Sequence, residues 1–232
     1  MHKARLPAEF LAAAKARRGD AGYRLDPSKT ALIVVDMQNA FVAPGAPLEV
    51  PAARGIVDNI NRLAQALRQA GGKVVWVMST MPQKDSARDW IYLSDFLASA
   101  NRETVRAALR PGSVHHELWP QLDRQPGDLA SYKDRFSPFS PGASDLDARL
   151  KDEGIREVIV TGTLTNVCCE CTARDAMMLN YRVIVPEDAN AAGSDEDHLH
   201  GLATVARLFA EVVTCDELID RIVTRESCRP SC

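Results

Sequence analysis

The hydrophobic positions of this chain alternate between two spacings. Short runs of aliphatic and β-branched residues, typical of strands that are buried on both faces, are separated by stretches in which apolar residues recur every three to four positions, as on one face of a helix. The short runs predict six strands, at 31–35, 74–77, 129–132, 158–160, 183–185 and 212–213. The longer stretches predict helices at about 56–67, 144–153, 167–179, 194–206 and 215–223.

Repeated strand–helix–strand units predict an α/β fold with a mostly parallel sheet and helices on both faces. We expect one such domain over residues 30–225. Residues 1–29 are predicted to form an N-terminal helical arm and a linker, and residues 226–232 a polar C-terminal tail. Residues 81–127 do not fit the alternation and form a long insertion rich in aromatic residues, which indicates a functional or interface role.

Composition narrows the class of protein. The chain has 232 residues, 46% of them hydrophobic, and a net charge of −3, so it is expected to be globular, with no nucleic-acid or membrane partner. Its first 20 residues lack the apolar core of a signal peptide. Three of the six cysteines crowd into four positions, which argues against a disulfide framework and favours a cytoplasmic protein. The cysteines are Cys168, Cys169, Cys171, Cys215, Cys228 and Cys232, and the sequence assigns no function to the last five.

Three reactive side chains come directly after predicted strands. Asp36 follows the first strand, Lys133 the third, and Cys168 lies in a loop that follows the fourth strand and opens a helix. Ligands of open parallel sheets bind at the carboxyl ends of the strands, so these side chains are expected to meet in one crevice. Burial should raise the pKa of Asp36 unless a cation lies close, and a buried Lys133 could provide that cation.

Cys168 is the strongest candidate for a nucleophile. A thiol at a helix N-terminus lies near free amides and the positive end of the helix dipole, which predicts a pKa well below the ordinary ~8.5. The same amides can stabilise a developing oxyanion. A zinc site built from Cys168, Cys169 and Cys171 is disfavoured, because adjacent residues of a helix point about 100° apart. We therefore expect no metal and no cofactor.

With these residues in place, the chain resembles the isochorismatase-like cysteine hydrolases, among them nicotinamidases and amidohydrolases of N-carbamoylsarcosine and ureidoacrylate. The resemblance rests on the segment LIVVDMQNAF, which contains Asp36, on Lys133, and on the segment VTGTLTNVCCECTARDA, which contains Cys168. It implies a three-layer α/β/α sandwich with a six-stranded sheet in the order 3-2-1-4-5-6, and a dimer or tetramer. It also implies an Asp-Lys-Cys triad, a cis peptide between Thr163 and Leu164, and an oxyanion hole formed by the backbone amides of Leu164 and Cys168.

Two segments near the motifs, residues 81–86 and the segment that begins at Arg135, indicate which substrates are favoured. Nicotinamidases carry an Asp-x-His metal motif after the second strand, whereas residues 81–86 contain no histidine, so a metal-bound pyridine site is disfavoured. The segment that begins at Arg135 resembles the ureidoacrylate and carbamoyl branch, and Arg135 could pair with a substrate carboxylate. Gln38, Phe136 and Trp90 are the other predicted substrate-binding residues.

The expected activity is cysteine-dependent hydrolysis of a C–N bond in a small carboxamide, ureide or N-carbamoyl compound through a thioester. Two alternatives stay open. One is a vinyl-ether hydrolase of the isochorismatase type, whose members lack the cysteine. The other is a catalytically silent scaffold on the same fold.

Overall fold

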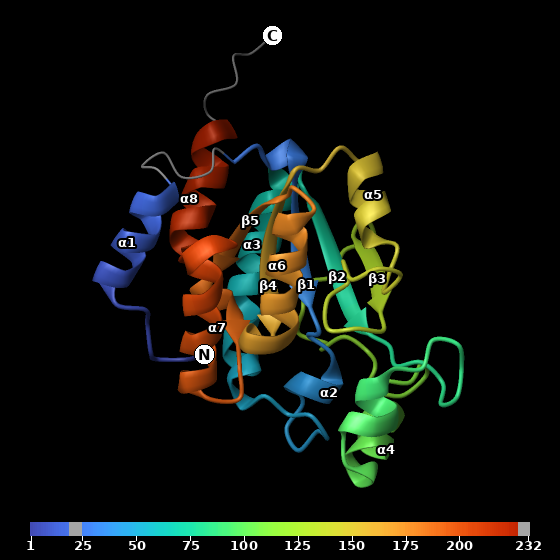
Figure 1. Ribbon diagram of the computed structural model, residues 1–232. Helices are drawn as coiled ribbons and strands as arrows, with labels where there is room; N and C mark the ends of the chain where they lie inside the picture. The colour runs from blue at the N-terminus through green and yellow to red at the C-terminus, as the bar shows by residue number, and fades with distance from the viewer. Residues whose placement is uncertain (19–24, 227–232) are drawn as a thin grey trace.

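A parallel β-sheet forms the middle of the molecule (Figure 1). The computed structural model describes residues 1–18 and 25–226. Six strands follow the order β3-β2-β1-β4-β5-β7, and the two-residue β6 pairs with the end of β4. This confirms the predicted sheet order, to which β6 is an unpredicted addition. The strands are β1 (Thr30–Val35), β2 (Lys73–Ser79), β3 (Leu129–Lys133), β4 (Glu157–Thr163), β5 (Arg182–Pro186), β6 (Asn190–Ala191) and β7 (Glu211–Val213).

Helices cover both faces of the sheet, which makes the fold a three-layer sandwich. Buried residues of α3 and α8 share one hydrophobic core with one face of the sheet. Those of α5, α6 and α7 share a second core with the other face. The helices are α1 (Ala8–Arg18), α2 (Asn39–Val42), α3 (Val57–Gln69), α4 (Ser99–Ala108), α5 (Leu146–Asp152), α6 (Glu170–Met178), α7 (Asp195–Leu208) and α8 (Cys215–Glu226), with short helical turns η1 (Pro27–Lys29), η2 (Pro51–Ile56), η3 (Tyr92–Phe96), η4 (Thr165–Cys169) and η5 (Glu187–Ala189).

Strand β1 is apolar from Ala31 to Val35 because these residues contribute to both cores. All six of its residues are buried. Leu32 and Val34 face the core under α3, whereas Ala31, Ile33 and Val35 face the core under α6 and α7. A strand of a parallel sheet that is covered on both faces needs such a continuous hydrophobic run.

Strands β1 and β4 approach each other closely at their carboxyl ends. Their parallel register pairs Val35 with Gly162. Gly162 has a φ of 111°, and a Cβ atom there would lie 2.0 Å from the carbonyl oxygen of Val35. Glycine is therefore required at this position, and the segments that follow the two strands start side by side.

The N-terminal arm packs on the outside of the second core. Leu6 and Ala14 are buried members of that core, and the guanidinium of Arg207 in α7 lies 5.3 Å from the centre of the Phe10 ring. The structure thus contains the predicted helix in the arm. Of the predicted tail 226–232, Glu226 ends α8, and Cys228 and Cys232 lie outside the described residues.

The insertion 81–127 holds a helix that the periodicity did not predict. Helix α4 and the turn η3 lie with α2 beyond the carboxyl ends of the strands, at the lower end of the view in Figure 1. The predicted helix at 167–179 instead begins as a π-helical turn, η4, before α6. Among the described residues, no helix has the length and apolar character needed to cross a bilayer.

Candidate active site

Asp36, Lys133 and Cys168 meet at the carboxyl ends of the central strands. The Nζ atom of Lys133 lies 2.8 Å from Oδ2 of Asp36 and 3.6 Å from Sγ of Cys168. Asp36 follows β1, Lys133 ends β3, and Cys168 lies in η4. Strand β2 separates β1 from β3. The long side chain of lysine is therefore needed to pass the end of β2 and reach the carboxylate.

Ser79, the last residue of β2, links the members of this group. Its Oγ atom accepts a hydrogen bond from Nζ of Lys133 at 2.7 Å. Its backbone N–H donates to Oδ1 of Asp36 at 3.0 Å and to Oε1 of Gln38 at 2.9 Å. Ser79 is not among the predicted site residues, although its place two residues after the predicted strand 74–77 was the available signal.

The backbone of Asp36 is held in an uncommon conformation. Its φ is 52°, in the left-handed region that few residues other than glycine, asparagine and aspartate adopt. The N–H of Asp36 donates to the carbonyl of Val77 at 2.9 Å, and Oγ1 of Thr163 donates to the carbonyl of Asp36 at 3.0 Å. Neighbours on both sides thus fix the direction of the carboxylate.

Burial is the largest single influence on the pKa values of Lys133 and Cys168. By itself it would lower the pKa of Lys133, but the interactions of the ammonium group with Asp36 and Cys168 together outweigh burial, and the pKa is raised. Burial raises the pKa of the Cys168 thiol, and the positive charge of Lys133 offsets this only in part. The lowered thiol pKa expected from a helix N-terminus is therefore wrong, because Cys168 is 5% exposed and loss of hydration dominates.

The loop before Cys168 leaves β4 through a cis peptide bond between Thr163 and Leu164. The carbonyl of Leu164 accepts hydrogen bonds from the N–H groups of Val167 at 3.0 Å and of Cys169 at 3.1 Å. These bonds curl residues 165–169 into a single π-helical turn. The turn holds the sulfur of Cys168 over the ends of β1 and β4.

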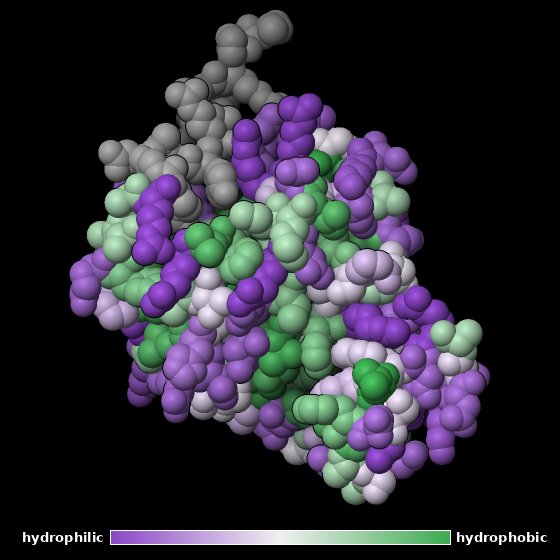
Figure 2. Space-filling model, in the orientation of Figure 1, coloured by the Kyte–Doolittle hydropathy of each residue, from purple (hydrophilic) through white to green (hydrophobic). Residues whose placement is uncertain are grey.

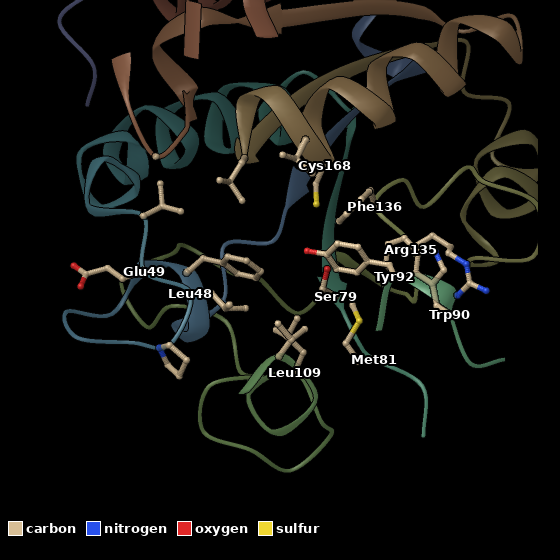
Figure 3. Close-up of a pocket in the computed structure, with 17 residues that line it drawn as sticks. Leu48, Glu49, Ser79, Met81, Trp90, Tyr92, Leu109, Arg135, Phe136 and Cys168 are labelled. Atoms are coloured by element: carbon tan, nitrogen blue, oxygen red, sulfur yellow. The ribbon is translucent and has the colours of Figure 1, made fainter. Parts of the chain in front are cut away.

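A cavity of about 630 Å³ lies in front of Cys168, and we call it the Cys168 cavity. Figure 3 shows the sulfur at one end of it, with Ser79 and Tyr92 close by. Trp90, Tyr92 and Phe136 form an aromatic group in its wall, with ring centres 4.8–5.1 Å apart. The wall also includes Leu164, Val167 and residues of the segments 41–50 and 81–109.

The predicted substrate-binding residues do not all reach this cavity. Arg135, Phe136 and Trp90 line it. Gln38 does not, because it is fully buried beside the site and its Nε2 atom donates to the carbonyls of Ser79 at 3.1 Å and His116 at 2.8 Å. Gln38 therefore holds the backbone at Ser79 and His116 in place. The hydropathy pattern of the sequence does not distinguish a residue in that role from one that contacts a substrate.

The donor groups of the site are those of a thiol, a carboxylate and an amine. Within residues 1–18 and 25–226, no three His, Cys, Asp or Glu side chains are grouped in a way that could hold a metal ion. The arrangement places a thiol and a carboxylate in one buried group, with a cation in contact with both.

Comparison with known proteins finds a matching domain family and solved structures of similar fold. Residues 30–217 match the isochorismatase domain. A cysteine hydrolase from Pseudomonas syringae pv. phaseolicola 1448A is 33% identical, with a TM-score of 0.79 over 87% of this chain and 96% of that protein. An isochorismatase-like hydrolase from Alkaliphilus metalliredigens is 30% identical, with a TM-score of 0.67 over 83% and 98%. N-carbamoylsarcosine amidase from Thermoplasma acidophilum is 29% identical, with a TM-score of 0.65 over 81% and 97%.

Proposed function

The chain belongs to the isochorismatase family and is a hydrolase, and we propose that it is a cysteine-dependent amidohydrolase. It cleaves the C–N bond of a carboxamide, ureide or N-carbamoyl compound through a thioester on Cys168. The observation that carries the proposal is the position of Lys133, whose Nζ atom contacts both Asp36 and Cys168 at the end of a large cavity. The thiol is neutral at rest and lies beside a carboxylate. The carboxylate can therefore take the thiol proton before the sulfur attacks the substrate carbonyl.

In the first half of the reaction, Asp36 takes the proton of the Cys168 thiol. The sulfur forms a bond to the substrate carbonyl carbon, and the carbonyl oxygen takes up negative charge. The backbone amides of Leu164 and Cys168 donate hydrogen bonds to this oxygen. As the C–N bond breaks, protonated Asp36 returns its proton to the leaving nitrogen, so that ammonia or an amine departs and a thioester remains.

In the second half, water replaces the amine. Asp36 takes a proton from the water, whose oxygen attacks the thioester carbonyl. The C–S bond then breaks, and the proton returns to the sulfur, so that the acid and free Cys168 are formed. Lys133 holds the carboxylate of Asp36 through a direct ion pair, and Ser79 holds Lys133 in place.

The test is ammonia release from a panel of amides, ureides and N-carbamoyl compounds by the wild type and by Cys168→Ala. Cys169→Ala is the matched control, because Cys169 is also a buried thiol of η4 but bonds to the carbonyl of Thr161 at 3.8 Å instead of to Lys133. We expect release that is lost in Cys168→Ala, kept in Cys169→Ala and insensitive to a chelator. Release that persists in Cys168→Ala, or absence of release from every compound, would contradict the proposal.

A further inference from the structure

The Cys168 cavity is larger and more apolar than cleavage of a small ureide requires. Its 630 Å³ lies in the middle of the range for pockets that bind drug-sized ligands. Its wall beyond the sulfur consists largely of hydrocarbon, and Figure 2 shows hydrophobic surface gathered in the hollow between the body of the molecule and the lobe that contains α4. The residues that form this apolar wall include Leu48, Val50, Met81, Val105, Leu109 and Val167.

Two of the residues that line the Cys168 cavity carry a full charge, and both charges are already paired. The guanidinium of Arg135 lies 3.4 Å from a carboxylate oxygen of Asp134, donates to the carbonyl of Asp134 at 2.8 Å, and lies 5.2 Å from the centre of the Trp90 ring. Glu49 accepts from Arg54 at 2.8 Å and from the N–H of Gly45 at 2.8 Å.

The direction in which these two side chains point also leaves neither charge free beside Cys168. In Figure 3, the charged ends of Arg135 and Glu49 lie on opposite sides of the cavity and point away from Cys168. A carboxylate bound beside the sulfur would lose its hydration without gaining a free cation, which is costly in an apolar wall. A hydrocarbon group in the same place would gain from burial.

We infer that the Cys168 cavity selects an uncharged carboxamide with a bulky apolar acyl group. The inference rests on the proposed cysteine-dependent hydrolysis and specifies its substrate. The reaction is R–CO–NH₂ + H₂O → R–COOH + NH₃, with R in contact with Trp90, Tyr92 and Phe136 and with the aliphatic residues that line the same cavity. Arg135 stiffens the aromatic wall by stacking on Trp90 and does not anchor a carboxylate.

The test compares two amides that differ in one group. 4-Phenylbutanamide and glutaramate share the chain and the amide, but a carboxylate in glutaramate replaces the phenyl ring. Butanamide, which lacks both groups, and N-carbamoylglycine, a charged ureide, complete the set. We expect kcat/KM for 4-phenylbutanamide to exceed those of butanamide and glutaramate by roughly 10- to 100-fold, as burial of a phenyl group predicts.

A variant of the wall provides a second readout. Met81 is half-buried and lines the same cavity as the aromatic group. Met81→Lys places a cation in the cavity and should shift the ratio of kcat/KM values toward glutaramate by about 10-fold or more. Met81→Leu, which keeps the wall apolar, should keep the preference for the phenyl compound.

Two failures can be told apart. Faster hydrolysis of glutaramate or N-carbamoylglycine than of 4-phenylbutanamide would overturn the apolar substrate class and leave the amidohydrolase intact. If that activity fell in Arg135→Gln, Arg135 would be the carboxylate anchor instead. Absence of Cys168-dependent ammonia release from all four compounds and from the wider panel would overturn both proposals.

Discussion

Lys133 donates to Asp36 over 2.8 Å, and solvent reaches neither side chain. A buried ion pair of this kind contributes little net stability, because the attraction between the charges must first offset the loss of their hydration. Loss of one partner is different, because the other is left as an unpaired charge in the interior. The pair therefore couples the stability of the fold to the chemistry of the site.

The first prediction concerns this pair. Lys133→Met should lower the free energy of unfolding by about 3–5 kcal/mol and abolish activity, because it leaves Asp36 buried without a counter-charge. The double variant Asp36→Asn/Lys133→Met should recover most of the stability but none of the activity. Asparagine is chosen because it tolerates the left-handed φ of 52° at position 36. Urea unfolding measures the effect, and additive losses in the double variant would argue against coupling.

The second prediction concerns the hydroxyl of Ser79. Ser79→Ala removes the acceptor that lies 2.7 Å from Nζ of Lys133 and should cost about 1–3 kcal/mol of stability and about tenfold in kcat. Ser131→Ala is the matched control, because Ser131 is equally buried in the adjacent strand β3 but its hydroxyl has no hydrogen-bond partner in the described part of the chain. Equal effects of the two substitutions on kcat would show that Ser79 has no role in positioning Lys133.

The third prediction concerns the ionisation of Cys168. Because burial raises the pKa of its thiol, alkylation by iodoacetamide should be slow at neutral pH and should still accelerate above about pH 9. Mass spectrometry of the tryptic peptide gives the rate at each pH. An exposed cysteine in a short peptide, whose pKa is about 8.5, provides the reference. A rate that levels off below about pH 8 would instead indicate a thiolate in the resting enzyme.

The fourth prediction concerns His198 in α7, which is buried against the N-terminal arm. Burial and the positive charges of His2 and Arg5 lower the pKa of His198 to about 4, although the charge of Asp195 opposes them. The unfolded chain binds this proton at a pKa of about 6.5. Its contribution to stability is therefore complete above about pH 6.5 and is lost as the pH falls toward 4.

Unfolding experiments test this dependence. Between about pH 7.5 and about pH 4.5, the His198 contribution to the free energy of unfolding should fall by about 2–3 kcal/mol. His198→Gln should remove that part of the pH dependence. His200→Gln, at an exposed position of the same helix, should leave it in place. Identical pH profiles for the wild type and His198→Gln would refute the assignment.

The fold was predictable because each strand of a covered parallel sheet must be apolar on both faces. The run at 31–35 could be nothing but a central strand, and reactive residues directly after such strands must converge. The positions of Asp36, Lys133 and Cys168 after their strands were therefore enough to predict that they lie together. Helix α4 was not predictable in this way, because only its inward edge, around Val105 and Leu109, is apolar.

The electrostatics of the site were not predictable from local sequence. A thiol at the start of a helix suggests a low pKa, but the enclosure of Cys168 depends on walls contributed by distant segments, such as Tyr92 and Phe136. The burial of Gln38 away from the cavity was not predictable for a related reason. Its amide binds the carbonyl of His116, 78 residues away, and no local pattern reveals such a partner.

The adjacency of β1 and β4 also has a consequence for how the enzyme forms. Their pairing joins Thr30 to Glu157, and the side chains of these two residues are hydrogen-bonded across 127 positions of sequence. The chain must pay the entropy of closing that loop before the pairing can stabilise it. A nascent chain that has not yet reached β4 therefore holds Asp36 and Lys133 but does not yet contain Cys168. Catalytic competence arrives late in folding, and recovery of activity should lag behind formation of the helices.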